Sequence, residues 1–426
     1  MGPKVIALAA AALLCFLAAG CRSGGRAGSE TDRSAAGADL HRRVLTIDSH
    51  AGFTGDPLTT CGSTERQVDF PKMRSGGLDA TFFTVYAAQR ERTPAIHAET
   101  QSRALETFRR LHELARLCSD DVAVARTPAE LVEIVESGRL AIAIGVENGF
   151  TLGGDLDLVE RFAELGASYL GPTHDGHNAL ADSATPRPEL ADLAAEHGGL
   201  SPLGERLIAE LNRLGVMVDV SHMSKAATLD AIRVSRAPVI ASHSSMYAIA
   251  PHPRNLDDET LLALAAKGGV VQITPVHEFL KVDPPGAMEA FYALLDEFGL
   301  ENDSEARSLP PERRAEFERR YGEMLERWPL ATVADFVDHI DHAVGLVGVD
   351  HVGIGSDFEG GAGVTGWMHA GETAGVTAEL LRRGYDEEEI RKIWGGNLLR
   401  VWTEIRARSE GADRSRTSRG RFPPLS

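Results

Sequence analysis

The stretch VMVDVSHMSKAATLDAIRVSRAPVIASH, residues 216–243, contains one complete copy of the pattern that decides the fold. A short apolar run at 216–222 ends in His222. Apolar residues at three- and four-residue spacing follow at 225–234, and a second apolar run at 238–243 ends in His243. These periodicities predict a strand, a helix and a second strand. Because the two histidines are one strand–helix repeat apart, we expect them at the same ends of neighbouring parallel strands.

The same alternation recurs along most of the chain. Apolar, β-rich runs lie at 44–50, 80–86, 140–147, 167–174, 216–222, 238–243, 269–274 and 351–357. Apolar residues at helical spacing lie at 94–117, 156–165, 204–214, 225–234, 257–267 and 333–347. Eight strand–helix alternations without a Rossmann-type glycine motif predict an α/β fold, a closed (β/α)₈ TIM barrel, rather than an open doubly wound sheet.

One connection is too long for a barrel loop. Residues 276–329 contain helical segments that are interrupted at Pro284-Pro285 and Pro310-Pro311. This predicts a helical insertion between strands 7 and 8 of the barrel.

The amino terminus is typical of a secretory signal. Lys4 precedes an uncharged run at 5–20, which is short for a membrane span but suits a signal peptide. Its end, Leu17-Ala18-Ala19-Gly20-Cys21, resembles the bacterial lipoprotein box, so we expect Cys21 to be lipidated. The alternative is an ordinary signal peptide cut nearby, with Cys21 incidental. Arg22 after the cysteine predicts the outer membrane, facing the periplasm, in a Gram-negative cell envelope.

Amino-acid composition predicts where the segments of the chain begin and end. Residues 1–20 are expected to be the signal peptide and 21–40 a flexible tether, because Ser, Gly, Ala and charged residues bury too little apolar surface to fold. With 43% hydrophobic residues in 426, the chain can bury a large core. We expect a single barrel domain at 41–405 and a disordered tail at 406–426.

The net charge excludes one class of binding partner, and the cysteines raise the question of a disulfide. The net charge of −18 excludes nucleic acid as a partner, since nucleic-acid binding depends on clustered Lys and Arg. Four cysteines are present; Cys15 leaves with the signal peptide and Cys21 is the expected anchor. Cys61 and Cys118 remain in an oxidising compartment, either as a disulfide or as two free thiols.

Most of the predicted strands end in a residue that can bind a metal or move a proton. A single such histidine would more often be structural, but barrel enzymes place their active sites at the carboxyl ends of the strands. Together they predict one compact site, made of His50, Glu147, His174, His222, His243 and Asp357. Imidazole nitrogen and carboxylate oxygen suit zinc, and three ligands leave a position open for water, as hydrolysis requires.

Five motifs carry a family resemblance. They are Gly145-Val146-Glu147-Asn148, Asp219-Val220-Ser221-His222, Ser242-His243-Ser244-Ser245, His252-Pro253-Arg254-Asn255 and Gly353-Ile354-Gly355-Ser356-Asp357-Phe358. In order and spacing they resemble the membrane (renal) dipeptidase family of zinc metallopeptidases, and segments 69–86 and 395–400 extend the resemblance over 44–401. The resemblance implies a barrel of the metallo-dependent hydrolase type that hydrolyses dipeptides at two bridged zinc ions.

The resemblance also implies roles for individual residues. Glu147 is implied to bridge the zinc ions, with His222 and His243 as ligands of one ion and His50 as a ligand of the other.

Three further residues are implied to act on the substrate. His174 is implied to contact it around the scissile carbonyl and Asp357 to transfer a proton. Arg254 is implied to hold its terminal carboxylate, for which the forked guanidinium is suited.

The end of the first strand departs from the family. The family has His-x-Asp there, with both residues ligating one zinc ion, whereas this chain has His50-Ala51-Gly52. Asp48 and Asp56 are the two replacements that the sequence leaves open. Without one of them the first-strand ion keeps only His50 and the bridge, so we expect one or two zinc ions per chain.

Two functions are compatible with these residues. The first is a zinc-dependent dipeptidase that cleaves the peptide bond with metal-activated water. The second is a catalytically impaired, lipid-anchored peptide-binding protein that retains the barrel and its pocket. The presence of Asp357, His174 and Arg254 favours the enzyme. The compatible partners are small peptides, a membrane reached through the lipid anchor, and a second copy of the chain in a homodimer.

Overall fold

The computed structural model describes residues 37–53, 59–300 and 303–409. Cys21, the signal peptide and Asp56 lie outside the described residues.

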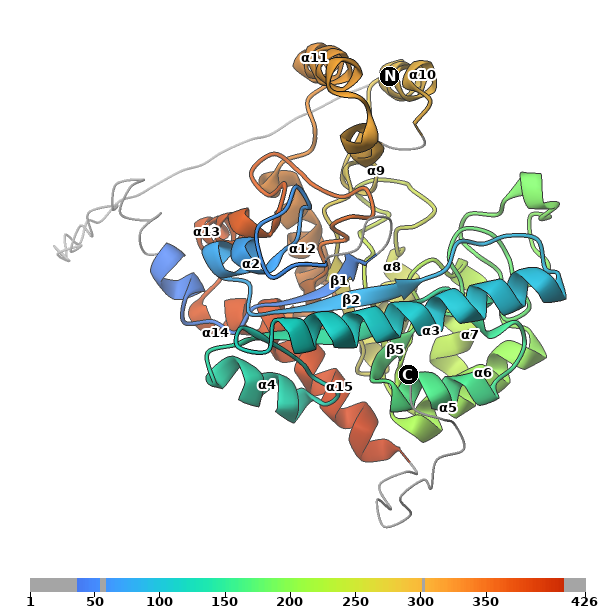
Figure 1. Ribbon diagram of the computed structural model, residues 1–426. Helices are drawn as coiled ribbons and strands as arrows, with labels where there is room; N and C mark the ends of the chain where they lie inside the picture. The colour runs from blue at the N-terminus through green and yellow to red at the C-terminus, as the bar shows by residue number, and fades with distance from the viewer. Residues whose placement is uncertain (1–36, 54–58, 301–302, 410–426) are drawn as a thin grey trace, which may run out of the picture.

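Parallel strands form the centre of the molecule (Figure 1). In order of pairing they are β1 (Ile47–Gly52), β2 (Ala80–Tyr86), β4 (Leu140–Glu147), β5 (Ala167–Leu170), β6 (Met217–Asp219), β7 (Val239–Ala241), β8 (Val270–Ile273) and β9 (Val352–Ile354). A further strand, β3 (Val122–Val124), pairs with β4 outside this path.

The two ends of the sheet meet through the backbone beyond β9. The amide of Asp357 donates to the carbonyl of His50 at 2.8 Å, and the amide of Gly52 donates to the carbonyl of Phe358 at 2.7 Å. The result is a nearly closed, eight-stranded parallel barrel, which confirms the predicted (β/α)₈ fold.

Helices surround the strands (Figure 1). They are α2 (Phe70–Gly76), α3 (Pro94–Leu117), α4 (Pro128–Glu136), α5 (Asp157–Glu164), α6 (Pro202–Leu214), α7 (Lys225–Val234), α8 (Asp258–Ala266), α12 (Val333–Val347), α13 (Ala374–Arg383), α14 (Glu387–Arg391) and α15 (Asn397–Arg408). Helices α3, α4 and α6 begin in the same way: Thr93, Thr127 and Ser201 cap the first turn with their side chains, and proline follows. The hydroxyl satisfies a free amide, and proline has none to satisfy.

The helical insertion lies between β8 and β9, the seventh and eighth barrel strands, as predicted. It contains α9 (His277–Leu280), α10 (Ala287–Phe298) and α11 (Pro311–Arg327), and Figure 1 shows α10 and α11 at the top of the view, away from the strands. Leu294, Phe298 and Phe317 belong to a small core of the insertion's own.

The barrel interior is filled with alternate residues of the strands. Phe82 and Tyr169 stack with ring centroids 5.8 Å apart, and Trp402 of α15 packs edge-on against Phe82 at 5.5 Å. Because side chains of a strand alternate between its faces, these apolar positions lie on the inner face. They form the floor below the residues that end the strands.

The ordered domain extends slightly beyond its expected limits. Residues 37–41 are helical, with Leu40 and His41 buried, and α15 continues to Arg408. Leu40 packs in the hydrophobic core, and Arg408 donates to the Arg236 carbonyl at 3.0 Å, so these residues of the expected tether and tail contact the barrel domain.

The Cys61 and Cys118 sulfurs form a disulfide, with their Cα atoms 5.6 Å apart. The bond joins the segment after β1 to the end of α3. Of the two alternatives left open by the sequence, the structure contains the disulfide.

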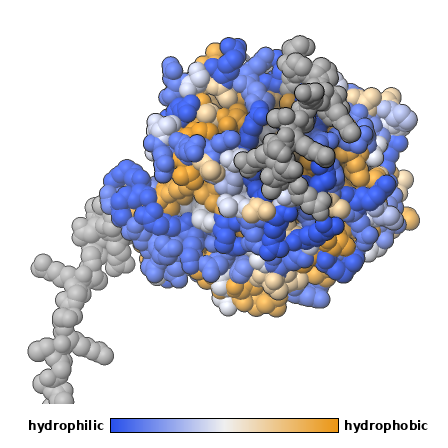
Figure 2. Space-filling view, turned by 90° about the horizontal axis from the view of Figure 1, so that it is seen from below, coloured by the Kyte–Doolittle hydropathy of each residue, from blue (hydrophilic) through white to orange (hydrophobic). Residues whose placement is uncertain are grey.

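Hydrophilic residues surround separate hydrophobic areas on the face of the molecule shown in Figure 2. Among the described helices, none combines the length and the apolar character needed to cross a bilayer.

Candidate active site

Five predicted site residues meet around the carboxylate of a sixth, Glu147, which ends β4. His50 lies in β1, while His174, His222, His243 and Asp357 lie in the loops that follow β5, β6, β7 and β9. The carboxyl ends of parallel strands share one end of the barrel, and this brings residues from distant parts of the chain together.

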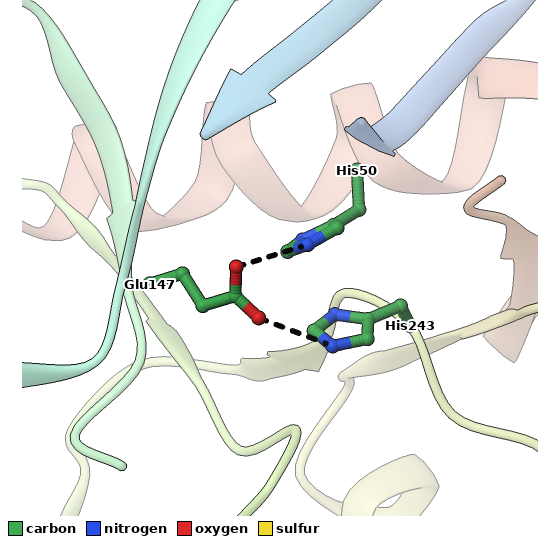
Figure 3. Close-up of side chains that lie close together, drawn as sticks. All are labelled: His50, Glu147 and His243. Carbon is green, nitrogen blue, oxygen red and sulfur yellow. Dashed lines mark ion pairs between the residues drawn. The ribbon is translucent and has the colours of Figure 1, made fainter. Parts of the chain in front are cut away.

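The two oxygens of Glu147 face different histidines (Figure 3). Oε2 lies 3.4 Å from Nε2 of His50. Oε1 lies 3.2 Å from Nε2 of His222, 3.6 Å from Nε2 of His243 and 3.7 Å from Nε2 of His174. Each oxygen of this carboxylate could therefore bind a separate ion, so Glu147 is placed as a bridging ligand would be.

Ligand atoms gather into two groups that share Glu147. His50, Glu147 and His243 form one group and Glu147, His174 and His222 the other, with ligand atoms within 4.8 Å of one another. This differs from the expected pairing of His222 with His243, which stays a prediction.

Hydrogen bonds on the far side of three rings decide which nitrogen faces Glu147. Nδ1 of His50 lies 2.9 Å from the hydroxyl of Tyr169, and Nδ1 of His222 lies 3.1 Å from Oδ1 of Asp175. Nδ1 of His243 lies 2.7 Å from the hydroxyl of Ser242.

Each of these partners can accept a hydrogen bond from a protonated Nδ1. The Ser242 hydroxyl donates to Asp219 at 2.6 Å and the Tyr169 hydroxyl donates to the Ser49 carbonyl at 3.2 Å, so both oxygens are free to accept. Asp175 accepts as a carboxylate. Nε2 of each ring is then left with its lone pair toward Glu147, as metal ligation requires.

The donor set fits a divalent metal ion. Nε2 of His243 is buried and has no hydrogen-bond partner among the described residues. A buried polar atom of this kind costs free energy unless it is paired, and a bound ion would pair it. Imidazole nitrogens around a carboxylate are the ligands that zinc and related ions prefer.

The charges around Glu147 also favour a bound cation. Burial alone would raise the pKa of Glu147, but His50, His222 and His174 hold it well below its usual range. Burial would lower the pKa of His50, but Glu147 and Asp357 raise it to about 9. The two carboxylates thus favour a positive charge at Nε2 of His50, which a bound metal ion would supply.

Two further site residues have strongly shifted acidities. Burial raises the pKa of Asp357 to about 6, and its Oδ1 lies 3.7 Å from Nε2 of His50. Burial and the neighbouring His222 lower the pKa of His174 to about 3, so this ring is neutral near pH 7. A carboxyl group that titrates near neutrality can both accept and return a proton.

The backbone is strained at several of these positions. Asn148, His222 and Asp357 have φ angles of 76°, 68° and 53°, in the left-handed region that residues other than glycine seldom adopt. The carbonyl of His222 is held by the amide of Ala184 at 2.8 Å. Strain that neighbouring hydrogen bonds maintain is typical of functional sites.

Arg254 is a buried cation beside a cavity. It is only 4% exposed, donates to the carbonyl of His243 at 3.4 Å and lies over the ring of Phe279 at 5.4 Å. It forms no ion pair with a carboxylate of the described residues, and burial lowers its pKa although the charges of Asp175, Asp357 and Glu147 act in the opposite direction. The cavity of about 350 Å³ is lined by Arg254, His222, Met223 and Leu256, among others. A buried, unpaired guanidinium favours an anionic ligand.

Asp48 does not join the metal-ligand groups. Its Oδ1 accepts from the amides of Ser356 at 2.6 Å and His50 at 3.2 Å, and its Oδ2 accepts from the hydroxyls of Ser356 at 2.6 Å and Thr81 at 3.3 Å. These donors bind β1 to the loop after β9. Of the two replacements left open by the sequence, Asp48 is engaged in this structural role.

Sequence reasoning missed the residues behind the rings. Tyr169, Asp175, Asp219 and Ser242 were not singled out. Two signals were available: Asp219 and Ser242 belong to motifs that also contain His222 and His243, and Asp175 directly follows His174.

Comparison with known proteins points to one group of enzymes. The sequence profile of the family "Membrane dipeptidase (Peptidase family M19)" matches residues 35–416. The dipeptidase aclJ of Aspergillus oryzae is 32% identical over 344 residues, which cover 80% of this chain and 70% of that protein. The dipeptidase tcpJ of Claviceps purpurea is 30% identical over 343 residues, covering 79% and 69%. The crystal structure of the probable dipeptidase PvdM from Pseudomonas aeruginosa has a TM-score of 0.77 and 32% identity, covering 89% of this chain and 100% of that one.

Proposed function

This chain belongs to the membrane dipeptidase family and is a metallodipeptidase hydrolase, and on that basis we propose that it is a zinc-dependent enzyme that cleaves free dipeptides. The observation that carries the proposal is Arg254, a buried guanidinium without a carboxylate partner among the described residues, next to the cluster around Glu147.

The cluster supplies the proposed metal ligands. Glu147 would bridge two ions, with His222 and His243 on one and His50 on the other. Zinc, when bound, would polarise the peptide carbonyl and lower the pKa of a water molecule toward neutrality. Because residue 52 is a glycine and supplies no carboxylate, the two ions would be bound with unequal affinity. The ion at the first strand would be held more weakly, so that one or two ions are bound per chain.

The substrate would be held at its carboxyl end. A carboxylate can accept two parallel hydrogen bonds from the guanidinium of Arg254, which gives both affinity and orientation. A fixed cation at this place would select substrates by length. Only in a dipeptide does the residue that follows the scissile bond also carry the free terminal carboxylate. The cavity beside Arg254 offers space for the carboxyl-terminal side chain.

His174 would stabilise the negative charge that develops on the carbonyl oxygen, and Asp357 would transfer the proton. The neutral ring of His174 can donate a hydrogen bond to the carbonyl oxygen as that oxygen gains negative charge. Asp357, with a pKa raised to about 6, can accept a proton from the attacking water and return it to the leaving amine. Proton transfer then begins and ends with the same protonation state of Asp357.

The cellular setting is part of the proposal. We infer that Cys21 carries the lipid and that the domain lies on the membrane surface in the cell envelope, since the Cys61–Cys118 disulfide is typical of oxidising compartments. Labelling with radioactive palmitate tests this: wild-type chain should incorporate the label, and Cys21→Ser should not. Label in Cys21→Ser would remove the anchor assignment.

Metal analysis and a dipeptide panel test the enzyme itself. The purified chain should contain zinc, lose activity when a chelator removes it, and regain activity when zinc is returned. Binding of dipeptides without turnover in the zinc-loaded protein would favour the alternative, an impaired lipid-anchored peptide-binding protein, for which the missing carboxylate at Gly52 is the supporting observation.

A further inference from the structure

The site histidines differ in the group that holds Nδ1. His50 and His243 each have a hydroxyl oxygen there, from Tyr169 and Ser242. His222 has the carboxylate of Asp175, with Oδ1 at 3.1 Å. An ionised acceptor makes a stronger hydrogen bond than a neutral hydroxyl, so the three rings are not held equally.

Asp175 is itself fixed by its surroundings. The Thr185 hydroxyl donates to the same Oδ1 that faces His222. Residues of this segment also hold the His222 backbone, since the amide of Ala184 and the hydroxyl of Ser183 donate to its carbonyl at 2.8 and 3.3 Å. The backbone and the ring of His222 are thus held from one loop.

The contact also determines what the ring can bind. A carboxylate on Nδ1 keeps the proton on that nitrogen and leaves the lone pair on Nε2, which points to Glu147 at 3.2 Å. It also makes Nε2 a better electron donor, and such outer carboxylates commonly change metal affinity about 10- to 100-fold.

We propose that Asp175 is a positioning residue that makes His222 the strongest histidine ligand of the cluster, so that the first metal ion binds on the His222 side of Glu147. The inference rests on the proposed metal-dependent function. It adds an order of filling: the ion next to His222 binds first, and the ion next to His50 second.

Because the Asp175 side chain is partly exposed, its role can be tested by substitution. The Asp175 side chain is 44% exposed, while that of His222 is 8% exposed. Removing the carboxylate therefore leaves no buried void. Glu189 offers a matched control in the same loop region, because its 58% exposed carboxylate pairs with Arg187 and contacts no site histidine.

The experiment measures metal affinity in the full mature chain. Metal-free protein is titrated with Zn²⁺ in competition with a chromophoric chelator. Asp175→Ala should weaken binding of the first ion about 10- to 100-fold. Asp175→Asn should recover part of the loss, since an amide oxygen can still accept from Nδ1 but carries no charge. Glu189→Ala should match wild type, and the melting temperatures of the metal-free proteins should agree.

Other outcomes separate this inference from the proposed function. Unchanged first-ion affinity in Asp175→Ala would overturn the positioning role, and so would an equal loss in Glu189→Ala. A lower melting temperature of metal-free Asp175→Ala with unchanged affinity would make Asp175 a loop-holding residue only. If wild-type chain binds no zinc and hydrolyses no dipeptide, the proposed function fails, and this inference fails with it.

Discussion

Gly52 lies directly against Glu359: a β-carbon on Gly52 would be 3.1 Å from the β-carbon of Glu359. The end of β1 therefore touches the loop after β9 at the position where the family resemblance implies an aspartate ligand. The Glu359 carboxylate is turned to other partners, accepting from Arg307 at 3.0 Å and from the Gln67 amide. Arg307 belongs to the insertion, so Glu359 links the insertion to the loop after β9.

This contact shapes the prediction for Gly52→Asp. A carboxylate two residues after His50 would supply the missing hard oxygen ligand. We expect the zinc content to rise from near one to near two per chain, with faster dipeptide hydrolysis, because paired ions hold both the attacking oxygen and the substrate. Zinc content by mass spectrometry and kcat/KM for a dipeptide are the measurements.

Gly52→Ala is the control, since it crowds Glu359 equally but adds no ligand. The Glu359 β-carbon must yield by a few tenths of an ångström in both variants. Zinc content near one and unaltered activity in Gly52→Asp would rule out a two-ion site that this carboxylate can restore. Zinc content near two in the wild type would show that another ligand already completes the site.

Removal of either principal histidine should abolish zinc binding and activity. His222→Ala and His243→Ala each remove one of only three ligands of the stronger proposed site. His351→Ala is the control, because His351 immediately precedes β9 at the opposite end of that strand. Full zinc retention in His222→Ala would disprove its assignment as a ligand.

Asp357→Asn should separate catalysis from metal binding. The amide cannot exchange a proton near neutral pH, so kcat should fall about 10²- to 10⁴-fold while much of the zinc remains. Asp350→Asn, which changes an exposed carboxylate just before β9, should retain wild-type kcat. A change in KM alone would mean that Asp357 acts only in binding.

Arg254 should make the enzyme depend on a free terminal carboxylate. Carboxyl-amidated dipeptides and longer peptides should be poor substrates, since the guanidinium loses or misplaces its partner. Arg254→Lys keeps the charge but loses the fork, and KM should rise about 10- to 100-fold, as expected when a charged hydrogen bond of about 1.5–3 kcal/mol is lost. Equal turnover of a dipeptide and its amide would exclude this role.

His41 should make the fold less stable in mild acid. Its Nε2 faces the Gly76 carbonyl at 2.9 Å and its Nδ1 faces the Thr377 hydroxyl at 2.6 Å, to which Trp394 also donates. Burial lowers the pKa of His41 below its usual 6.5. The unfolded chain therefore takes up a proton at a higher pH than the folded chain does, and the free energy of unfolding decreases as pH falls below about 6.5.

His41→Gln tests this dependence, because glutamine keeps hydrogen-bonding groups and does not titrate. Melting temperatures of both proteins are compared from about pH 8 to about pH 5, across the usual histidine range. The wild type should lose more stability on acidification than the variant. Parallel curves would contradict a contribution from His41.

Much of the fold could be predicted because it follows from local patterns. Helices α3 and α12 and strands β2 and β4 have the bounds that apolar periodicity indicated. Strand β3 was missed because it has only three residues, and helix α4 was missed although Thr127-Pro128 is a recognisable helix start. Helix α15 was also missed, although Leu398, Val401, Trp402 and Ile405 recur in it at helical spacing.

The sequence by itself determined the barrel, the kinds of ligand at its strand ends and the departure at Gly52, because periodicity and side-chain chemistry are properties of the local chain. Only the tertiary structure decided that Asp48 accepts a hydrogen bond from Ser356, that Asp175 contacts Nδ1 of His222 and that Cys61 forms a disulfide with Cys118. These contacts depend on which atoms of distant segments come within hydrogen-bonding or bonding distance, and closure of the barrel sets those distances.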